Sequence, residues 1–285
     1  MNLFTRKLLQ YLPDKLFIKI KFYHHFKRVP NLKNPQTYNE KLQWLKLNDR
    51  RPEYTKMVDK FEAKKLVSSI IGDEYVIPSY GVWDSFDDID FKNLPNKFVL
   101  KTTHDCGGVV ICKDKNSFDK VKAKEFLEKH MKYNYFYEGR EWPYKDVKPR
   151  ILAEPYMENI DTGDLKDYKV FAFNGVAKAL YIASDRQSNN EETKFDFFDM
   201  NYNKLDIRNG HPNSKYDYDK PIFLSEMKLI SEKISKGYPH IRVDFYEVNG
   251  KLYVGELTLF HMSGFAPFEP NSWDYEFGRW IALPK

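Results

Sequence analysis

Two Asn-Gly dipeptides, each flanked by alternating apolar runs, constrain the fold of this chain more than any other feature. The dipeptides are Asn174-Gly175 and Asn249-Gly250, and the runs beside them span residues 168–173, 177–183, 241–248 and 252–259. Asn and Gly tolerate the positive φ that a tight two-residue hairpin turn requires. Each pair of runs is therefore predicted to form an antiparallel hairpin, which excludes a fold built only from βαβ repeats.

Other apolar runs place the remaining elements and set the fold class. Further β-rich runs span residues 98–101, 109–112 and 151–157. Helical spacing of apolar residues covers 3–28, 35–48, 52–71, 118–131 and 223–236. Neither a P-loop nor a dinucleotide-binding glycine motif occurs, so a nucleotide site would need another construction. The pattern predicts an α+β fold with antiparallel sheets.

Positive charge is concentrated at the start of the chain. The net charge is +5, yet the segment up to Lys33 holds eight Lys or Arg and one acid, Asp14. The rest is slightly acidic, which disfavours a nucleic-acid groove and predicts no nucleic-acid partner. The basic segment has two interpretations: the solvated face of a helix packed on the body, or a surface for anionic lipid or an anionic polymer.

Targeting features and cysteines indicate a cytoplasmic protein. No apolar run is long enough to span a bilayer, and the first residues lack the apolar core and cleavage site of a signal peptide. Cys106 and Cys112 are the only cysteines and match no metal spacing, so reduced thiols are expected. The basic N-terminal segment leaves open a further possibility, which is peripheral contact with the inner face of the membrane.

The segment 98–112 has the composition of a phosphate-binding turn between two strands. Lys101 ends the first strand, and a polar turn with His104, Gly107 and Gly108 precedes the second. Glycine lets backbone N–H groups approach phosphate oxygens closely, and lysine supplies a positive charge. A glycine-containing hairpin with an exposed lysine is the alternative interpretation.

Two acids stand on opposite arms of the second Asn-Gly hairpin. Counting outward from the turn places Asp244 close to opposite Glu256, and alternation places Arg242 on the face of Asp244. Paired carboxylates repel unless a cation lies between them, and oxygen ligands on two strands suit Mg²⁺. Replacing either acid by its amide is then expected to keep the fold and even to relieve repulsion. The alternative is a polar face on which Arg242 neutralises Asp244.

A third candidate is the apolar run 151–157, which is interrupted by Glu154 and then Pro155. A strand that becomes a linker can offer backbone groups and one carboxylate to an adenine edge. By itself, Glu154 can equally be an acid on an edge strand.

Taken in order, these segments resemble the ATP-grasp superfamily and its TupA-like branch, associated with teichuronopeptide and capsular polysaccharide synthesis. The resemblance covers residues 54–268. It rests on Asp59-Lys60, Lys101 with Gly107-Gly108, AEPYM at 153–157, DYKVFAFNG at 167–175 and the RVDFY…GELT hairpin. It implies an ATP-grasp fold whose antiparallel sheets clamp ATP, preceded by basic N-terminal helices.

The resemblance also implies a nucleotide site. Two lysines would bind the ATP phosphates, and they match Lys60 and Lys101. The other cofactor-binding positions that it implies are His104, Gly107, Gly108, Glu154, Tyr156, Met157 and Asp161. Among these, Glu154 matches the hinge acid near adenine and Asp161 the acid that binds ribose.

The implied metal site consists of Asp244 and Glu256, with Mg²⁺ or Mn²⁺ as the ion. Thr258 stands at the third ligand position, where many relatives carry Asn. Arg242 and Arg186 are candidates for stabilising the transferred phosphoryl group, because a guanidinium matches a phosphate fork. Lys169, on the strand face of Asp167, is a further catalytic candidate.

Three regions and one activity follow from this resemblance. The regions are a helical region 1–52, a small lobe 53–150 and a large lobe with the metal site 151–285. Most relatives begin with an α/β domain, whereas this chain begins with basic helices. The implied activity is an ATP-dependent carboxylate–amine ligase that acts through an acylphosphate. Its partners would be ATP, an amine or amino acid, and a uronic acid of a surface polysaccharide or its lipid-linked precursor.

Two other functions stay open at this point. Asp217-Tyr218-Asp219 is a DxD triplet that could hold a metal and a sugar diphosphate in a metal-dependent glycosyltransferase, although a solvated loop is the simpler interpretation. The basic start also fits a catalytically silent scaffold in a membrane-associated assembly. Products separate the three: ADP for the ligase, a nucleoside diphosphate from a nucleotide sugar for the transferase, and neither for the scaffold.

Overall fold

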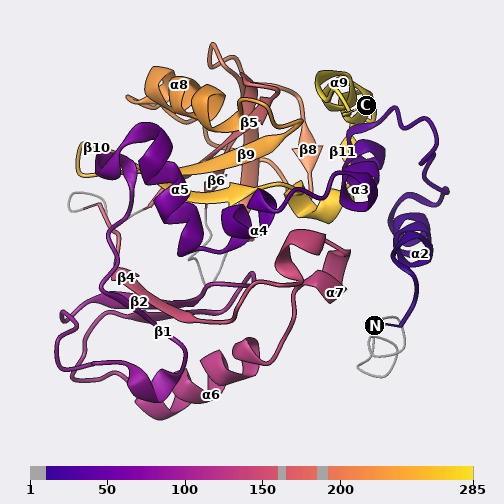
Figure 1. Ribbon diagram of the computed structural model, residues 1–285. Helices are drawn as coiled ribbons and strands as arrows, with labels where there is room; N and C mark the ends of the chain where they lie inside the picture. The colour runs from indigo at the N-terminus through magenta and orange to yellow at the C-terminus, as the bar shows by residue number, and fades with distance from the viewer. Residues whose placement is uncertain (1–10, 160–164, 185–191, 285) are drawn as a thin grey trace.

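The computed structural model describes residues 11–159, 165–184 and 192–284, and its two main β-sheets lie in separate lobes (Figure 1). The larger sheet has five antiparallel strands in the order β10-β9-β5-β6-β7. Its strands are β5 (Asp167–Phe173), β6 (Val176–Ser184), β7 (Lys194–Asp199), β9 (Ile241–Val248) and β10 (Lys251–Thr258). The sequence predicted all of these strands except β7.

Both Asn-Gly turns connect neighbouring strands, which confirms the two predicted hairpins. One turn links β5 to β6 and the other links β9 to β10, and all four turn residues have φ between 48° and 83°. Positive φ at both central residues gives a turn whose twist matches that of the strands. The second hairpin pairs Glu256 with Asp244, after a bulge between Val254 and Glu256.

The smaller sheet has four antiparallel strands in the order β1-β4-β2-β3. They are β1 (Gly81–Trp83), β2 (Phe98–Thr102), β3 (Val109–Cys112) and β4 (Ile151–Pro155). Helix α6 (Lys120–Met131) packs on this sheet, below it in Figure 1, and buries Leu127 against Phe98 and Leu100. Because β4 lies between β1 and β2, residues 151–155 join the smaller sheet, whereas the sequence placed the lobe boundary before them.

The single helix expected over residues 52–71 is two helices, α4 (Glu53–Val58) and α5 (Glu62–Ile71). Asp59 causes the break, because its side chain accepts hydrogen bonds from the backbone N–H groups of Phe61 (2.8 Å) and Glu62 (3.1 Å). A side chain that satisfies the first N–H groups of a helix favours a new start at that point. Both helices pack on the larger lobe, through contacts of α4 and α5 with β10 and of α5 with α8. The break leaves Lys60 on the short connection between them.

Other helices surround the larger sheet and extend the chain beyond it. They are α2 (Asp14–Phe26), α3 (Tyr38–Asn48), α7 (Phe136–Gly139), α8 (Leu224–Ser235) and α9 (Ser272–Trp280), with a small sheet of β8 (Arg208–Asn209) and β11 (Phe268–Glu269). Helix α3 begins with a capping box between Thr37 and Glu40 and packs against α9. The part of the first expected helix before residue 11 lies outside the described residues. Figure 1 shows α2 at the edge of the molecule, at the side opposite β10.

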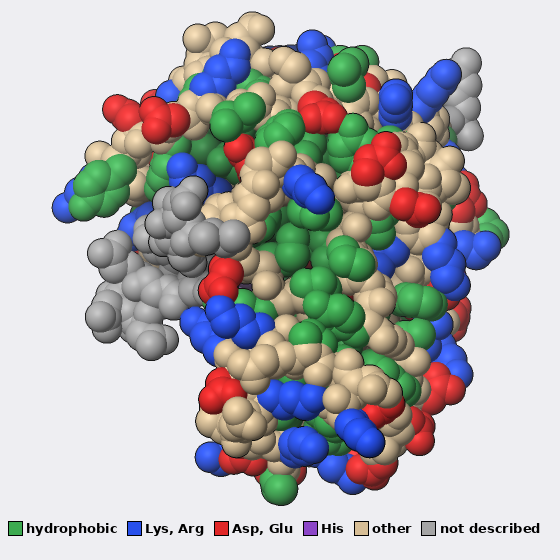
Figure 2. All heavy atoms as spheres, turned by 90° about the vertical axis from the view of Figure 1, so that its left-hand side faces the viewer, with side chains coloured by type: hydrophobic (Ala, Val, Ile, Leu, Met, Phe, Trp, Pro, Cys, Tyr) green, Lys and Arg blue, Asp and Glu red, His purple; other side chains and the backbone are tan. Residues whose placement is uncertain are grey.

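Charged side chains of both signs are interspersed on the face of the molecule that Figure 2 shows. This face carries no extended patch of one sign, in agreement with the weak net charge of the chain after its first segment. Within the described residues, every helix is too short or too polar to cross a bilayer.

Candidate active site

A cleft of about 800 Å³ lies between the two sheets, and many of the site residues predicted from the sequence line it. It is lined by Lys60, Lys101, Gly107, Val109, Ile111, Glu154, Tyr156, Met157, Asp167, Ser184, Tyr246 and Glu256, among others. Apolar side chains of β3 and cationic side chains thus face the same space, and the opposite wall carries acids. An apolar surface with a few convergent charged groups is what a nucleotide requires, with room for its base and its phosphates.

Glu154 holds two lysines at the small-lobe side of the cleft. Its carboxylate pairs with Lys101 of β2 at 2.5 Å and with Lys64 of α5 at 2.6 Å. Burial alone would raise the pKa of the Glu154 carboxyl, but the two ammonium groups outweigh burial and lower this pKa. Each oxygen of Glu154 therefore has a cationic partner, so the acid positions the lysines. The contact with adenine expected from the sequence stays a prediction, since Glu154 also lines the cleft.

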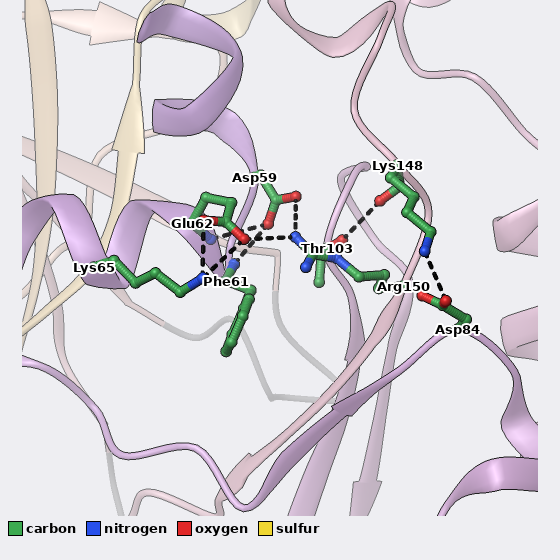
Figure 3. Close-up of polar contacts among 8 residues, drawn as sticks. All are labelled: Asp59, Phe61, Glu62, Lys65, Asp84, Thr103, Lys148 and Arg150. Carbon is green, nitrogen blue, oxygen red and sulfur yellow. Dashed lines mark hydrogen bonds and ion pairs between the residues drawn. The ribbon is translucent and has the colours of Figure 1, made fainter.

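Lys60 reaches the cleft from the break between α4 and α5. Its backbone N–H donates to the carbonyl of Thr103 (3.0 Å), and its ammonium donates to the carbonyl of Asp105. Arg150 joins the same connection, because it donates to Asp59 (2.8 Å) and to Glu62 (3.2 Å) (Figure 3). These bonds tie the connection that carries Lys60 to the end of β2, and so place both predicted phosphate lysines beside one turn.

The two glycines of that turn have different tasks. Gly107 has φ of 104°, and a Cβ built there would meet only a His130 atom at 3.9 Å, so open space lies beside it. A Cβ at Gly108 would lie 1.8 Å from Oγ1 of Thr102, which itself bonds Asp105. Gly108 is therefore required by the packing of the turn, whereas Gly107 leaves its backbone accessible to a ligand in the cleft.

The His104 side chain points away from the cleft. It is buried, and its Nε2 lies 3.2 Å from the carbonyl of His130 and 3.1 Å from that of Tyr133. Burial lowers the pKa of His104, so its imidazole is neutral and donates to these carbonyls. The structure makes this side chain a link between the turn and the end of α6, and only its backbone is left for the predicted contact with phosphate.

Arg242 and Asp244 form a rigid pair on β9. The guanidinium donates to both carboxylate oxygens, from Nε at 2.6 Å and from the second terminal nitrogen at 2.7 Å. It also contacts Nδ1 of His261 at 2.7 Å and donates to the Thr258 hydroxyl at 2.9 Å. All guanidinium nitrogens are thus engaged, and the planar group has one fixed orientation.

Lys169 adds a second cation to this pair and corrects the sequence interpretation. β5 pairs with β9 so that Lys169 lies opposite Asp244, and the Lys169 ammonium bonds both Asp244 and Asp167, the latter at 2.7 Å. Burial would lower the pKa of Lys169, but the two carboxylates outweigh burial and raise it. From the sequence, Arg242 was the only protein cation expected beside the acids of this face. The structure shows that Asp244 is neutralised from two sides.

Glu256 differs from Asp244 because it faces the cleft without a hydrogen bond or close ion pair to another described residue, although its charge acts on Lys101 and Arg242. Mg²⁺ in nucleotide sites is commonly held by one or two carboxylates, with phosphate oxygens and water as the remaining ligands. Asp244 and Glu256 are such a pair across β9 and β10. In the described part of the chain, no group of three or more His, Cys, Asp or Glu could hold a metal alone. Glu256 therefore offers an open carboxylate to an ion that shares its ligands with a nucleotide, whereas the Asp244 oxygens already accept from Arg242 and Lys169 and would have to be shared with that ion.

The remaining predicted residues are placed as follows. Thr258 lies opposite Arg242 and accepts a hydrogen bond from it, which leaves its hydroxyl beside the two acids. Tyr156 and Met157 follow β4 and line the cleft. Asp161 and Arg186 lie outside the described residues.

Three residues of the site were missed in the sequence. Lys64 follows Lys60 by four residues. Had the start of α5 been recognised in the sequence, this helical spacing would have indicated that Lys64 lies on the same side as Lys60. Asp167 belongs to the motif that drew attention to Lys169. Tyr218 was considered only as the centre of an acidic triplet, yet it lines the cleft and donates to the Ser184 hydroxyl at 2.7 Å.

Similarity to known proteins is found in one family and in several solved structures. The family model of the TupA-like ATP-grasp proteins matches residues 40–282. No curated protein matches the chain. Among solved structures, the chain is similar to the D-alanine–D-alanine ligase from Helicobacter pylori (12% identity, TM-score 0.47), covering 86% of this chain and 69% of that one.

Two further structures show a similar likeness. The ATP-grasp ligase PsnB, complexed with a minimal precursor, is 10% identical with a TM-score of 0.41, over 73% of this chain and 54% of PsnB. The D-alanine–D-alanine ligase from Bacillus anthracis, complexed with ATP, is 17% identical with a TM-score of 0.41, over 71% and 53% of the two chains. The chain thus spans about half the length of these two structures. On the family match over most of its length, the chain belongs to the TupA-like ATP-grasp family.

Proposed function

We propose that this chain is an ATP-dependent carboxylate–amine ligase that acts through an acylphosphate. The observation that supports it is a cleft lined both by the lysines Lys60 and Lys101 and by the acid Glu256. Lysines suit the phosphate oxygens of a nucleotide, and acids suit the metal ion that accompanies them. Membership of an ATP-grasp family agrees with this arrangement.

Each wall of the cleft has its own task in this proposal. Lys60 and Lys101 bind the ATP phosphates, and the backbone at Gly107 approaches them. Bound Mg²⁺ or Mn²⁺, held by Asp244 and Glu256, would neutralise negative charge on the phosphates. Arg242, whose guanidinium nitrogens are engaged by Asp244, His261 and Thr258, positions Asp244 and Thr258 on the metal side of the cleft and adds a buried positive charge there. On the same proposal, Asp161 binds ribose, Arg186 assists the phosphoryl group, and Lys169 and Thr258 complete the metal side.

The reaction balances in two steps. An oxygen of the substrate carboxylate attacks the γ-phosphorus of ATP, the bond to the β-phosphate oxygen breaks, and ADP leaves. The nitrogen of the amine then attacks the acyl carbon and loses a proton, and phosphate leaves with the oxygen that came from the carboxylate. The products are an amide, ADP and phosphate.

We further propose a uronic acid of a surface polysaccharide, or its lipid-linked precursor, as the carboxylate and an amino acid or amine as its partner. The support is the family, whose TupA-like branch is associated with such polymers. The reaction would take place in the cytoplasm, at the inner face of the membrane, where a lipid-linked precursor is accessible.

The path of one oxygen atom tests this proposal. The chain is incubated with ATP, Mg²⁺, a panel of amines and a panel of uronic acids whose carboxylates carry a heavy-oxygen label. We expect ADP release that requires the acid, and one labelled oxygen in the released phosphate. Lys101→Ala should abolish both signals, whereas Lys97→Ala, at an exposed lysine of the same lobe that pairs with Glu158, should retain them.

Other outcomes would contradict the proposal in different ways. Label in AMP would show an adenylate in place of an acylphosphate. Amide formation only with non-sugar acids would remove the uronic acid and keep the ligase. Release of a nucleoside diphosphate from a nucleotide sugar would indicate the glycosyltransferase.

The structure does not favour that transferase. The Asp217 side chain is 96% exposed and lies 3.4 Å from Lys204, while Tyr218 between the two acids turns to the cleft. The triplet thus does not present two acids together toward the cleft.

A further inference from the structure

Helix α2 has two faces with opposite relations to the rest of the protein. Phe17, Ile18 and Phe22 are buried against the body. On the opposite side of the same helix, Leu16, Ile20 and Tyr23 are 46%, 47% and 55% exposed. A helix on a protein surface normally turns polar side chains outward, so this outer apolar stripe needs a separate explanation.

The inner face fixes the orientation of the helix. Asp14 pairs with Arg50 at 3.0 Å and with Arg140 at 3.3 Å. The Lys21 ammonium donates to the carbonyl of Glu138 at 2.6 Å and lies over the ring of Phe265. The outer stripe therefore belongs to a helix held in place by charged contacts on its other side.

Lysines border the outer stripe, and acids are absent from it. Lys15 and Lys27 are exposed and Lys19 is half-buried. Helical spacing places Lys15 and Lys19 along one border of the stripe, and Lys27 follows the last turn of the helix, where its ammonium donates to the carbonyl of His24 at 2.9 Å. Asp14 is the only acid before Glu40, and its contacts with two arginines draw it to the inner face. The outer face of α2 thus combines apolar side chains with uncompensated positive charge.

We propose that this outer face docks on a bilayer that contains anionic lipid. Leu16, Ile20 and Tyr23 would enter the boundary between headgroups and acyl chains, while Lys15 and Lys19 contact lipid phosphates. Apolar side chains at the centre and basic side chains at the border are the pattern of helices that lie in this interface. An acidic polysaccharide would match the lysines but offers no apolar layer, so a bilayer matches both halves of the surface.

None of these residues lines the cleft, so the surface is separate from the proposed active site and does not depend on the ligase activity. Deleting the helix would uncover the buried guanidinium of Arg140, which lies over the ring of Phe17. Exposed positions are therefore the appropriate ones to change, because their side chains do not pack in the core.

The test measures sedimentation of the full chain with vesicles. Vesicles of phosphatidylcholine with phosphatidylglycerol are compared with vesicles of phosphatidylcholine alone, at low and at high salt. We expect binding to the anionic vesicles that salt weakens. The variant L16S/I20S/Y23S should lower the partition coefficient roughly tenfold or more, since each side chain loses its burial. The variant K15Q/K19Q/K27Q should lower it about fivefold for each charge removed.

Helix α8 provides matched controls, because it also exposes one leucine and several lysines. L229S and K228Q/K233Q/K236Q should leave vesicle binding unchanged. The proposal is overturned if the full chain does not bind anionic vesicles. It is also overturned if the α2 and α8 variants lose vesicle binding to the same extent. It is also overturned if the α2 lysine variant loses binding only to an acidic polysaccharide, or if L16S/I20S/Y23S acts only by breaking up a dimer.

Discussion

Each lobe of the protein buries one carboxylate between two cations, and the two clusters differ in how firmly they are held. On the smaller sheet, Glu154 pairs with Lys101 of the same sheet and with Lys64 from α5, and the Lys101 side chain is still 25% exposed. In the large lobe, the Asp244 side chain is 1% exposed, and Arg242 donates to both of its oxygens. The first cluster borders the cleft with flexible ammonium groups, whereas the second is a planar bidentate pair inside the sheet.

This difference indicates which contacts change when a nucleotide binds. A lysine carries its charge on a flexible four-carbon stem, so Lys101 can exchange a carboxylate oxygen for a phosphate oxygen with little rearrangement. Arg242 cannot leave Asp244 without breaking two hydrogen bonds at once. We therefore expect the small-lobe cluster to exchange partners and the large-lobe cluster to remain a fixed frame.

The largest effect on stability is expected at Asp244. Asp244→Asn removes the charge that neutralises Arg242 and Lys169, and breaking a buried pair from one side costs about 3–5 kcal/mol. The free energy of unfolding, measured by urea denaturation, should fall by that amount. This reverses the expectation from sequence, which saw only repulsion between two acids. Asp206→Asn, at an exposed acid, is the control, and equal stability of both variants would contradict the rigid-frame assignment.

The next effect is expected at Glu154 and depends on pH. Lys101 and Lys64 outweigh burial and hold the folded-state pKa of this carboxyl below its ordinary value of 4.5. At a pH between the folded-state and unfolded-state pKa of Glu154, the unfolded chain binds more protons than the folded chain. The contribution of Glu154 to the free energy of unfolding is therefore complete above pH 4.5 and is lost as the pH falls through the folded-state pKa. Glu154→Gln should therefore lower the free energy of unfolding by about 1–3 kcal/mol at neutral pH.

The same comparison in acid provides the check. Below the folded-state pKa both forms carry a neutral side chain, so the stabilities of Glu154→Gln and the parent should converge. Urea denaturation across this range, reported as the difference between the two chains, removes the contribution of other titrating groups. A difference that stays constant with pH would show that the lysines do not act on Glu154 in this way.

A smaller effect on stability is expected at Lys101, with a larger one on nucleotide binding. Lys101→Ala leaves Glu154 with Lys64 as its partner, so the free energy of unfolding should fall by only about 1 kcal/mol, as for a partly exposed pair. ATP binding, measured by calorimetry, should weaken by about tenfold or more because a charge-assisted contact is lost. Normal ATP binding in this variant, with Lys97→Ala as its control, would leave Lys101 as a structural lysine.

Local patterns in the sequence predicted those parts of the site that lie close together along the chain. Counting from the Asn-Gly turn predicted that Asp244 and Glu256 lie close together, since register in a hairpin follows from the turn. The bulge between Val254 and Glu256, which counting does not reveal, is what places Glu256 directly opposite Asp244. The position of Lys101 before the glycine turn was likewise visible, because both belong to one hairpin, β2 to β3.

Contacts between distant segments could not be predicted in this way. Lys169 meets Asp244 only because β5 lies beside β9, and nothing in either segment specifies that neighbour. Lys64 meets Glu154 because its side chain reaches from α5, which packs on the larger lobe, to β4 of the smaller sheet. Asp59 starts α5 through side-chain hydrogen bonds that helical spacing does not reveal. The sequence interpretation assigned the polar turn residue His104 to a ligand. In the structure, its side chain instead contacts the carbonyl of His130 at the end of α6.

The smallest effect on stability, and the sharpest separation of structure from function, is expected at Glu256. Its carboxylate faces the cleft without a hydrogen bond or close ion pair to another described residue, so Glu256→Gln should change the free energy of unfolding by less than about 0.5 kcal/mol. The same change removes a proposed metal ligand, so ADP release should fall steeply, and the Mg²⁺ concentration needed for half-maximal activity should rise. Asp244→Asn would lose activity together with stability, whereas Glu256→Gln would lose activity alone. If Glu256→Gln turns over ATP at the parent rate with the parent's requirement for Mg²⁺, the metal side of the cleft has been assigned to the wrong residue, while the fixed pair of Arg242 and Asp244 would still stand on its own stability measurement.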